Sequence, residues 1–367
     1  MKVALFIGHH KTGSTSLQGY FCNNYDDLLR KGILYPAVES EGVAANLRSV
    51  LRGKRGEEET RFNVREPHNA LVFKLLHEVL EQDIPRWHPN LPSYHQMMLL
   101  IQHQVRELAP DHLVLCSEVF SRLGGQGWRL LLPKLRDALA SVGTTIVLNL
   151  RRPDKYLASW HQQRLKFGAK LSPLREDGLK GYLGSIHFRV DQIAERWSEV
   201  FTDATLILRN YDEVLAAGGS VTDFFAQTGL PKAVGDDDSA LNPSVPFALA
   251  EVARLANHTI PSIAGAVMDY LLGIGSRIDL TPNAQVEMFG AANRHALCKA
   301  FEPVHRGIAK MAGRTLFFPD IDDARTVRPV PELEALRAAL PLVQADVRQA
   351  KVSEPVRDFI TGFRLPV

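Results

Sequence analysis

The sequence predicts an α/β fold in which a parallel β-sheet is flanked by helices and followed by a mainly helical C-terminal part. Four short apolar runs alternate with stretches of helical periodicity, and this alternation is typical of parallel sheets covered on both faces. The four runs are 2–7, 112–118, 144–150 and 205–208. From residue 231 onward only helical patterns recur. We therefore expect two domains, a core over 1–230 and a helical extension over 231–367.

The first elements of the predicted core follow from local patterns. After the first apolar run, apolar residues at helical spacing predict a helix over 14–31 that is closed by Gly32. Residues 33–36 then form a short edge strand that ends at its proline. The polar stretch 38–69 predicts an exposed excursion between elements.

Helices are predicted between the later strands and throughout the C-terminal part. The predicted ranges are 69–82, 94–108, 128–139, a segment from 220 to Gly229, 247–256, 262–272, 284–301 and 332–340. A break rich in proline, glycine and aspartate over 230–239 separates the two domains. Asp269 interrupts the apolar stretch 260–275, so we expect a buried helix there and not a membrane span.

Composition excludes several classes of function. The 43 basic and 41 acidic residues nearly balance, so nothing favours binding to nucleic acid or to a membrane surface. Three cysteines, Cys22, Cys116 and Cys298, lie far apart without metal or redox spacing, which suits a reducing compartment. The first apolar run is too short for a signal peptide. We expect a cytoplasmic protein without a transmembrane segment, and the oligomeric state stays open.

The segment between the first strand and the first helix predicts an anion-binding loop. It runs from Gly8 to Gln18 and is rich in glycine, serine and threonine. Gly13 allows close approach of the backbone, and the free amides of a helix N-terminus favour phosphate or sulfate. The residues expected to hold the anion are Lys11, Thr12, Gly13, Ser14, Thr15 and Ser16. Loops of this composition also occur in α/β proteins without a ligand, and that alternative stays open.

The position of the lysine separates two types of phosphate loop. A Walker A loop has the pattern G-x-x-x-x-G-K-[ST]; Gly8 and Gly13 have this spacing, but Ser14 occupies the lysine position. The lysine of this chain is Lys11, before the second glycine. Residues 10–18, H-K-T-G-S-T-S-L-Q, resemble the loop of sulfotransferases that use 3′-phosphoadenosine-5′-phosphosulfate (PAPS). The bacterial type, with H-K-T-G-[ST]-[ST]-x-L-Q, is the most similar.

A second motif follows the strand at 144–150. Arg151 ends this strand, Pro153 suits the first turn of a helix, and Ser159 lies two turns further on, so a guanidinium and a hydroxyl are expected near one point. Guanidinium groups bind phosphate through paired donors. Arg151 and Ser159 resemble the arginine and serine that hold the 3′-phosphate in sulfotransferases, with Arg152 at a variable position. For a single arginine at a strand end, a surface ion pair is the alternative.

The resemblance implies a P-loop-like fold, an enzyme and a mechanism. PAPS is the implied co-substrate, and the implied acceptor is a hydroxyl on a carbohydrate, a lipid or a small metabolite. Sulfuryl transfer is similar to phosphoryl transfer, in which positioning and charge stabilisation matter more than covalent chemistry. Lys11 is expected to stabilise the departing phosphate. No apolar strand ends in an aspartate of the Walker B kind, so we infer no metal.

Three residues are candidates for the general base that takes the acceptor's proton. Glu118 comes first because it ends the strand at 112–118, where open α/β sheets place their ligands. The resemblance agrees, since glutamate is the base in carbohydrate sulfotransferases. His10 and His9 are the other candidates. The alternatives are a Glu118 that caps or pairs with a cation, a His10 that orders the loop and a His9 that belongs to the core.

Two other functions stay open at this point. An ATP-dependent kinase fits a phosphate loop, but it fits neither the displaced lysine nor a second phosphate site. A nucleotide-binding protein without catalysis also fits the loop, although Lys11 and Glu118 are both present. No motif identifies the acceptor or the role of the C-terminal part.

Overall fold

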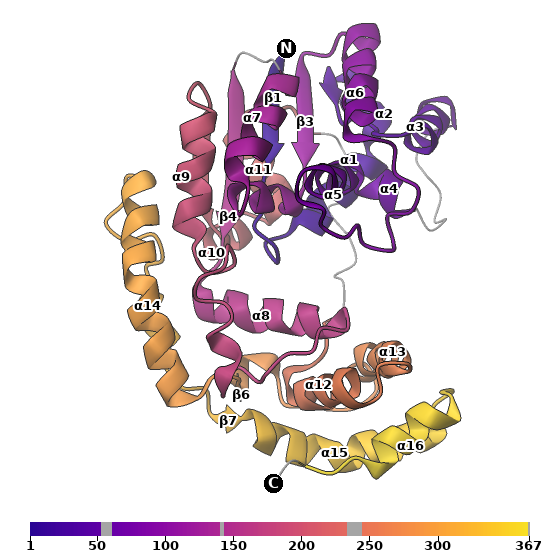
Figure 1. Cartoon of the computed structure of the whole chain (residues 1–367), viewed down its shortest axis with the longest axis vertical. Coiled ribbons are helices and arrows are strands. Elements are labelled where there is room, and N and C mark those ends of the chain that lie inside the picture. The colour runs from indigo at the N-terminus through magenta and orange to yellow at the C-terminus, as the bar shows by residue number, and fades with distance from the viewer. Residues whose placement is uncertain (53–60, 140–142, 233–243, 366–367) are drawn as a thin grey trace. The chain divides into compact units, whose positions relative to one another are not determined.

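The computed structural model describes residues 1–52, 61–139, 143–232 and 244–365 of the chain, whose course is coloured in Figure 1. Contacts divide the chain into two compact units. Unit 1 combines Met1–Arg151, Arg189–Leu241 and Val304–Phe317, and unit 2 combines Arg152–Phe188, Asn242–Pro303 and Phe318–Val367. This partition differs from the predicted domains, because both units are assembled from separate segments. The predicted break at 230–239 falls largely outside the described residues.

Unit 1 contains a five-stranded parallel sheet in the order β2-β3-β1-β4-β5. The strands are β1 (Lys2–Phe6), β2 (Ile33–Leu34), β3 (His112–Cys116), β4 (Thr144–Leu150) and β5 (Thr205–Asn210). In β1 every residue after Lys2 is buried, as expected for a central strand with both faces covered. The predicted α/β fold with a parallel sheet is confirmed.

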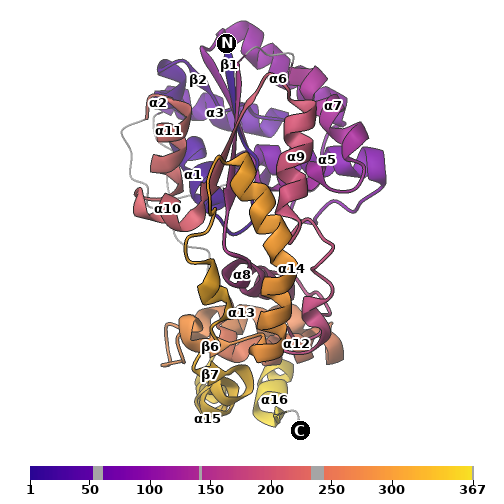
Figure 2. The ribbon, with the colours of Figure 1, turned by 90° about the vertical axis from the view of Figure 1, so that its left-hand side faces the viewer.

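Helices cover both faces of this sheet. Figure 2 shows α1, α2 and α11 on one face and α5, α6, α7 and α9 on the other. Their bounds are α1 (Ser14–Asn23), α2 (Tyr25–Arg30), α11 (Ser220–Thr228), α5 (Pro67–Leu80), α6 (Tyr94–Leu108), α7 (Trp128–Leu139) and α9 (Val190–Val200). Unit 1 also contains α3 (Ser40–Arg52), α4 (Phe62–Arg65) and α10 (Tyr211–Ala216). The sheet's carboxyl ends and the loops that follow them thus have a rigid support.

Two local predictions for this region were wrong. The predicted helix over 14–31 is broken at Asn24, because the side-chain amide of Asn24 donates to the Tyr20 carbonyl at 2.9 Å and competes with the helical pattern. The end of α2 before Gly32 is confirmed, and this glycine has φ 74°. The predicted excursion 38–69 contains α3, α4 and the start of α5, while residues 53–60 lie outside the described part.

Unit 2 is mainly helical, as predicted for the C-terminal part. It contains α8 (Pro153–Lys166), α12 (Ala250–Thr259), α13 (Ala264–Ile274), α15 (Glu332–Gln349) and α16 (Glu354–Gly362). The residues of α14 (Gly290–Met311) are divided between the two units. A short parallel ladder of β6 (Val286–Glu287) and β7 (Val330–Pro331) was not predicted, since two residues are too few to show a period.

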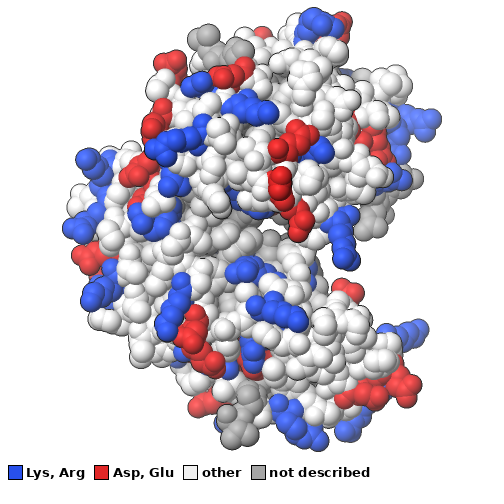
Figure 3. All heavy atoms as spheres, viewed as in Figure 1, with Lys and Arg blue, Asp and Glu red and all other residues white. Residues whose placement is uncertain are grey.

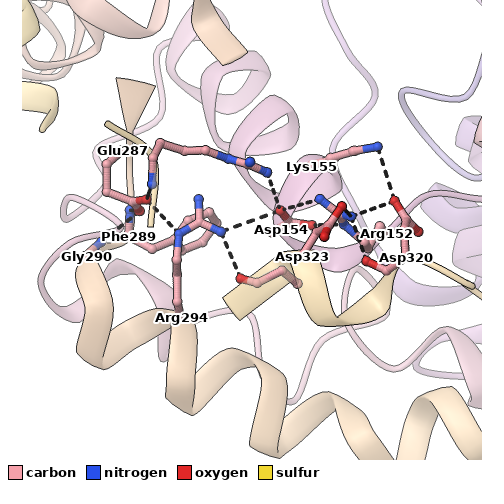
Figure 4. A network of polar contacts seen from close by, with 11 residues as sticks. Arg152, Asp154, Lys155, Glu287, Phe289, Gly290, Arg294, Asp320 and Asp323 are labelled. Carbon is pink, nitrogen blue, oxygen red and sulfur yellow. Dashed lines mark hydrogen bonds and ion pairs between the residues drawn. The ribbon is translucent and has the colours of Figure 1, made fainter. Parts of the chain in front are cut away.

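A buried ion-pair network surrounds the start of α8 in unit 2 (Figure 4). The Arg152 side chain is 1% exposed; its Nε lies 2.8 Å from Asp154 Oδ1, and its Nη1 lies 2.6 Å from Asp320 Oδ2. Arg294 Nη1 lies 3.5 Å from Asp154 Oδ2, and Arg294 Nε lies 2.6 Å from Glu287 Oε2. Charges are tolerated in a protein interior when they are paired in this way. Arg152 therefore forms buried ion pairs within unit 2, and these account for an arginine at this position without a ligand.

None of the helices described is long and apolar enough to span a bilayer. Helix α13, in the apolar stretch 260–275, buries Val267 and Leu271 and exposes Asp269, so it is buried on one side only. On the face shown in Figure 3, basic and acidic side chains are interspersed, in line with the nearly balanced total charge.

Candidate active site

The carboxyl ends of three neighbouring strands meet in unit 1. Beyond β1 and β4 the backbone pairing continues, because the Ile7 N–H donates to the Val147 carbonyl at 3.0 Å and the His9 N–H donates to the Asn149 carbonyl at 2.8 Å. Arg151 follows two residues after this last pair. The chain leaves β1 toward β2 and β3 on one side of the sheet, and β4 and β5 lie on the other. Open α/β sheets bind ligands at such a reversal of strand order.

Gly8 brings the loop against the end of β3. Its φ is 111°, which L side chains rarely adopt, and a Cβ at this position would lie 3.0 Å from the Glu118 carbonyl oxygen. A side chain at position 8 would therefore push the loop away from Glu118. This close contact explains the first glycine of the loop.

The loop from His9 to Gly13 is held by its own hydrogen bonds. The Thr12 hydroxyl donates to the His9 carbonyl at 2.6 Å, and the His10 N–H donates to His9 Nδ1 at 2.9 Å. Thr12 is fully buried, so its hydroxyl shapes the loop. From α11 the Ser220 hydroxyl donates to the Thr12 carbonyl at 3.1 Å, and a Cβ on Gly13 would overlap the Ser220 side chain. The loop is thus tied to a helix far away in the sequence.

The N-terminus of α1 is suited to an anion. Its first turn contains no acidic residue, and Gly13, the residue before it, has φ 85° and supplies no side-chain cap. Ser14 is buried, whereas Thr15 and Ser16 are half-buried. The first N–H groups of a helix lack helical partners and carry partial positive charge. Lys11, half-buried and with φ 61°, adds a full positive charge to this loop.

Glu118 lies at the end of β3, in contact with the loop. Burial, and secondarily the negative charge of Glu66, raise the pKa of the Glu118 carboxyl to about 7, although hydrogen bonds from Ser14 and Asn69 oppose this shift. Its Oε2 is buried and has no hydrogen-bond partner among the described residues. A carboxyl with a pKa near neutrality and one oxygen that accepts no hydrogen bond from the described residues is suited to accept a proton.

The two histidines of the loop have different surroundings. Burial, followed by the charges of His9, Arg122 and Lys11, lowers the pKa of His10 well below its usual value. His10 is therefore a weak base, and the pKa of Glu118 is better matched to proton transfer at neutral pH. His9 is 1% exposed, and its ring and carbonyl both accept hydrogen bonds within the loop. This agrees with a role of His9 in loop structure.

Arg151 lies beside Tyr211 at the start of α10. The Arg151 guanidinium carbon is 5.8 Å from the centre of the Tyr211 ring, a distance at which a cation and an aromatic face attract each other. The Tyr211 hydroxyl is hydrogen-bonded to Ser220, which also holds the loop. Tyr211 therefore connects the second motif to the first. Ser159 lies half-buried on α8 of unit 2, so its pairing with Arg151 stays a prediction.

Sequence reasoning missed a group of polar residues that surrounds Glu118. Asn69, near the start of α5, donates from its Nδ2 to Glu66 Oε2 at 2.9 Å and to Glu118 Oε1 at 3.4 Å. Glu66 forms an ion pair with Arg65, in which Arg65 Nη2 lies 2.7 Å from Glu66 Oε1. The only signal in the sequence is an acidic residue before Pro67, where a helix begins. It gives no indication that this helix start lies at the end of β3.

The structure fits a polyanionic ligand at these strand ends. The cationic groups are Lys11 and Arg151, which follow the neighbouring strands β1 and β4, and the start of α1 follows the same loop as Lys11. Asn149, at the end of β4, has a buried side-chain oxygen without a hydrogen-bond partner in the described part of the chain. Among the described residues, no group of three or more His, Cys, Asp or Glu side chains is placed to hold a metal ion.

A comparison of the chain with protein-family models, curated proteins and solved structures finds no match. We therefore infer the function from the residues of this chain and their geometry.

Proposed function

We propose that this protein is a sulfotransferase that moves the sulfuryl group of PAPS to an acceptor hydroxyl. The observation that carries this proposal is the meeting of three strand ends in unit 1: the Lys11 loop after β1, Glu118 after β3 and Arg151 after β4. These groups supply an anion-binding helix start, a proton acceptor and a second cation. A nucleotide with phosphates at both its 5′ and 3′ positions matches such a distribution of charge.

The proposed nucleotide site has two parts. The amides at Gly13, Ser14, Thr15 and Ser16 bind the 5′-phosphosulfate, because they belong to the uncapped start of α1. Arg151 binds the 3′-phosphate through paired N–H donors, as the resemblance to sulfotransferases implies. Tyr211 keeps the Arg151 guanidinium oriented through its ring face.

In the proposed reaction the bond between sulfur and the bridging oxygen of PAPS breaks, and a bond between sulfur and the acceptor oxygen forms. Glu118 takes the proton of the acceptor hydroxyl, and 3′,5′-adenosine bisphosphate leaves. Lys11 stabilises the negative charge that develops on the bridging oxygen. The protein's contribution is the positioning of both substrates and the neutralisation of charge.

The proposal extends to the acceptor class and the location. The acceptor is a hydroxyl on a carbohydrate, a lipid or a small metabolite, and no nucleic acid takes part, since total charge is nearly balanced. The three cysteines are buried and free of disulfides. Free thiols suit a reducing compartment, which supports a cytoplasmic location.

Thermal unfolding in the presence of nucleotides tests this proposal. A ligand that binds only the folded protein stabilises it by about 2.7 kcal/mol at 100 times its dissociation constant. We expect 3′,5′-adenosine bisphosphate to raise the melting temperature more than ATP with magnesium does. Lys11→Met should reduce the shift because it removes the charge of the loop.

Lys2→Met is the matched control, since Lys2 is exposed at the opposite end of the same strand. It should leave the bisphosphate shift unchanged. The absence of any shift at saturating bisphosphate would contradict the proposal. A shift with ATP and magnesium alone would favour a kinase instead.

A further inference from the structure

Asn69 occupies the centre of a buried polar cluster beside Glu118. It is 3% exposed, and its side-chain oxygen accepts from Gln18 Nε2 at 3.0 Å and from the Ser117 hydroxyl at 2.5 Å. Its side-chain nitrogen donates to Glu66 and to Glu118. These four contacts use both ends of the amide.

The cluster fixes the orientation of the Asn69 amide. If the amide were reversed, its oxygen would face the carboxylate oxygens of Glu66 and Glu118, and its nitrogen would face the donor groups of Gln18 and Ser117. The contacts with Gln18 and with the two carboxylates would then be repulsive, and the Ser117 hydroxyl would have to turn from donor to acceptor. Gln18 also donates to the Cys116 carbonyl at 3.3 Å, so the cluster is attached to the end of β3. Asn69 therefore presents its N–H groups to the two carboxyls and to nothing else described.

Glu66 is held on the other side of Asn69. Both Nε and Nη2 of Arg65 contact Glu66 Oε1, at 3.2 and 2.7 Å, while Glu66 Oε2 accepts from Asn69. Glu66 also precedes the first turn of α5, so its position is set by a helix start. The two carboxyls thus share one amide nitrogen, and only Glu66 has an arginine partner in the described contacts.

We propose that Asn69 is a positioning residue for Glu118, and that Glu66 is the fixed neighbouring carboxyl that shares the Asn69 amide nitrogen with it. Asn69 holds Glu118 Oε1, which leaves Oε2 to face the proton donor. This inference rests on the proposed function only for the source of that proton, the acceptor hydroxyl. The geometry of the three residues is independent of it.

Cys116 and Tyr35, two titratable groups that interact with Glu118, do not change charge near neutral pH. Burial raises the pKa of the Cys116 thiol and of the Tyr35 phenol well above their usual values, so both are neutral near pH 7. Ser14 contributes a hydrogen bond. Glu66 is thus the charged group that acts most directly on the pKa of Glu118, and its effect is testable by substitution.

Carbon-13 NMR of protein labelled at glutamate carboxyl carbons measures the pKa of Glu118 directly. The Glu118 signal is assigned by its absence in Glu118→Gln, and its pKa is measured in each variant. Glu66→Gln removes a neighbouring negative charge, so the pKa of Glu118 should fall by about one unit. Asn69→Ala removes a hydrogen bond to the charged form, so the pKa should rise. Ser117→Ala removes one of the two donors to the Asn69 oxygen and also the acceptor of the Val119 N–H, so it should raise the pKa of Glu118 by less.

Asn63→Ala is the matched control, because Asn63 is a buried asparagine of the neighbouring α4 whose described hydrogen bonds go to His88 and Pro89. It should leave the pKa of Glu118 unchanged. Equal titration of Glu118 in all variants, or shifts of one sign in both Glu66→Gln and Asn69→Ala, would overturn the inference. If Asn69→Ala does not fold, Ser117→Ala and Glu66→Gln still decide it.

Calorimetry of 3′,5′-adenosine bisphosphate with the same variants separates this inference from the proposed function. Opposite pKa shifts without bisphosphate binding to the wild type would support the positioning of Glu118 and contradict the sulfotransferase. Bisphosphate binding without pKa shifts would support the sulfotransferase and contradict the positioning of Glu118. We expect binding in the wild type and opposite shifts in the two variants.

Discussion

At the scale of single residues, Glu118 is the group whose chemistry depends most on its surroundings. It is placed by β3, touched by the loop at Gly8 and contacted by the Asn69 amide. Burial raises its pKa to about 7. A carboxyl in such a site binds its proton more tightly in the folded than in the unfolded protein, so the free energy of unfolding depends on pH.

The stability of the protein should depend on pH through Glu118. The pKa in the folded state, about 7, lies above the unfolded value, so the folded state binds the proton more tightly. This contribution is present at low pH and is lost as pH rises from about 4.5 through 7, at up to about 1.4 kcal/mol per pH unit. Relative to the wild type, Glu118→Gln should therefore be more stable at pH 8 than at pH 5, by about 2 kcal/mol.

Urea unfolding at the two pH values measures this difference. Glu332 also has a pKa raised to about 7, chiefly by burial, but its contribution is common to both proteins and cancels. Glu107→Gln, at an exposed position, serves as the control and should show no such dependence. A pH-independent difference between Glu118→Gln and wild type would contradict the environment described for Glu118.

At the scale of elements, the loop between β1 and α1 combines unusual backbone angles with the proposed anion site. Gly8 and Gly13 have positive φ, and so does Lys11 with φ 61°. Non-glycine residues in this region cost free energy and are concentrated at binding sites. The contacts from Ser220 and within the loop maintain this conformation.

The adjacent residues Arg151 and Arg152 should respond differently to the same substitution. Arg152→Met removes a buried cation, and among the described residues Asp154 keeps ion pairs with the more distant Arg294 (Figure 4) and Arg328. The expected loss is about 3 kcal/mol of unfolding free energy. Arg151→Met should cost about 1 kcal/mol or less and should weaken nucleotide binding instead. Urea unfolding of both variants checks this, and equal losses would contradict the separate roles.

The sequence allowed most elements of the sheet unit to be predicted, because their signals are local. The strands β1, β3 and β4 are continuous apolar runs, and the loop after β1 carries its glycines and lysine within a few residues. Helix α9 was missed, and β6 with β7 was too short to recognise. The break at Asn24 depends on a side-chain bond to the backbone that periodicity does not reveal.

At the scale of the whole molecule, the two units are each assembled from separate segments. The predicted division at residue 230 relied on composition along the chain, whereas residues 152–188 group with the mainly helical unit and residues 304–317 group with the sheet unit. Such long-range contacts leave no mark on a local pattern. The order of the strands makes β3, β1 and β4 neighbours, so that Glu118, the Lys11 loop and Arg151 follow adjacent strand ends.

The candidate site shows the same distinction. Lys11, Glu118 and Arg151 were identified because each follows an apolar strand and carries a chemistry that such ends use. Asn69, Glu66 and Tyr211 were not assigned a role. Asn69 lies 49 residues before Glu118, and its contact with Glu118 is apparent only once α5 packs beside the end of β3.

One measurement tests the central claim, that a nucleotide with phosphates at both ends binds across β1 and β4. Calorimetry compares 3′,5′-adenosine bisphosphate with adenosine 5′-monophosphate, in wild type and in Arg151→Met. We expect the wild type to bind the bisphosphate about 10 to 100 times more tightly, as for a charge-assisted hydrogen-bond pair. Arg151→Met should bind both ligands alike. Equal affinities in the wild type, or a preference that survives in Arg151→Met, would contradict the account.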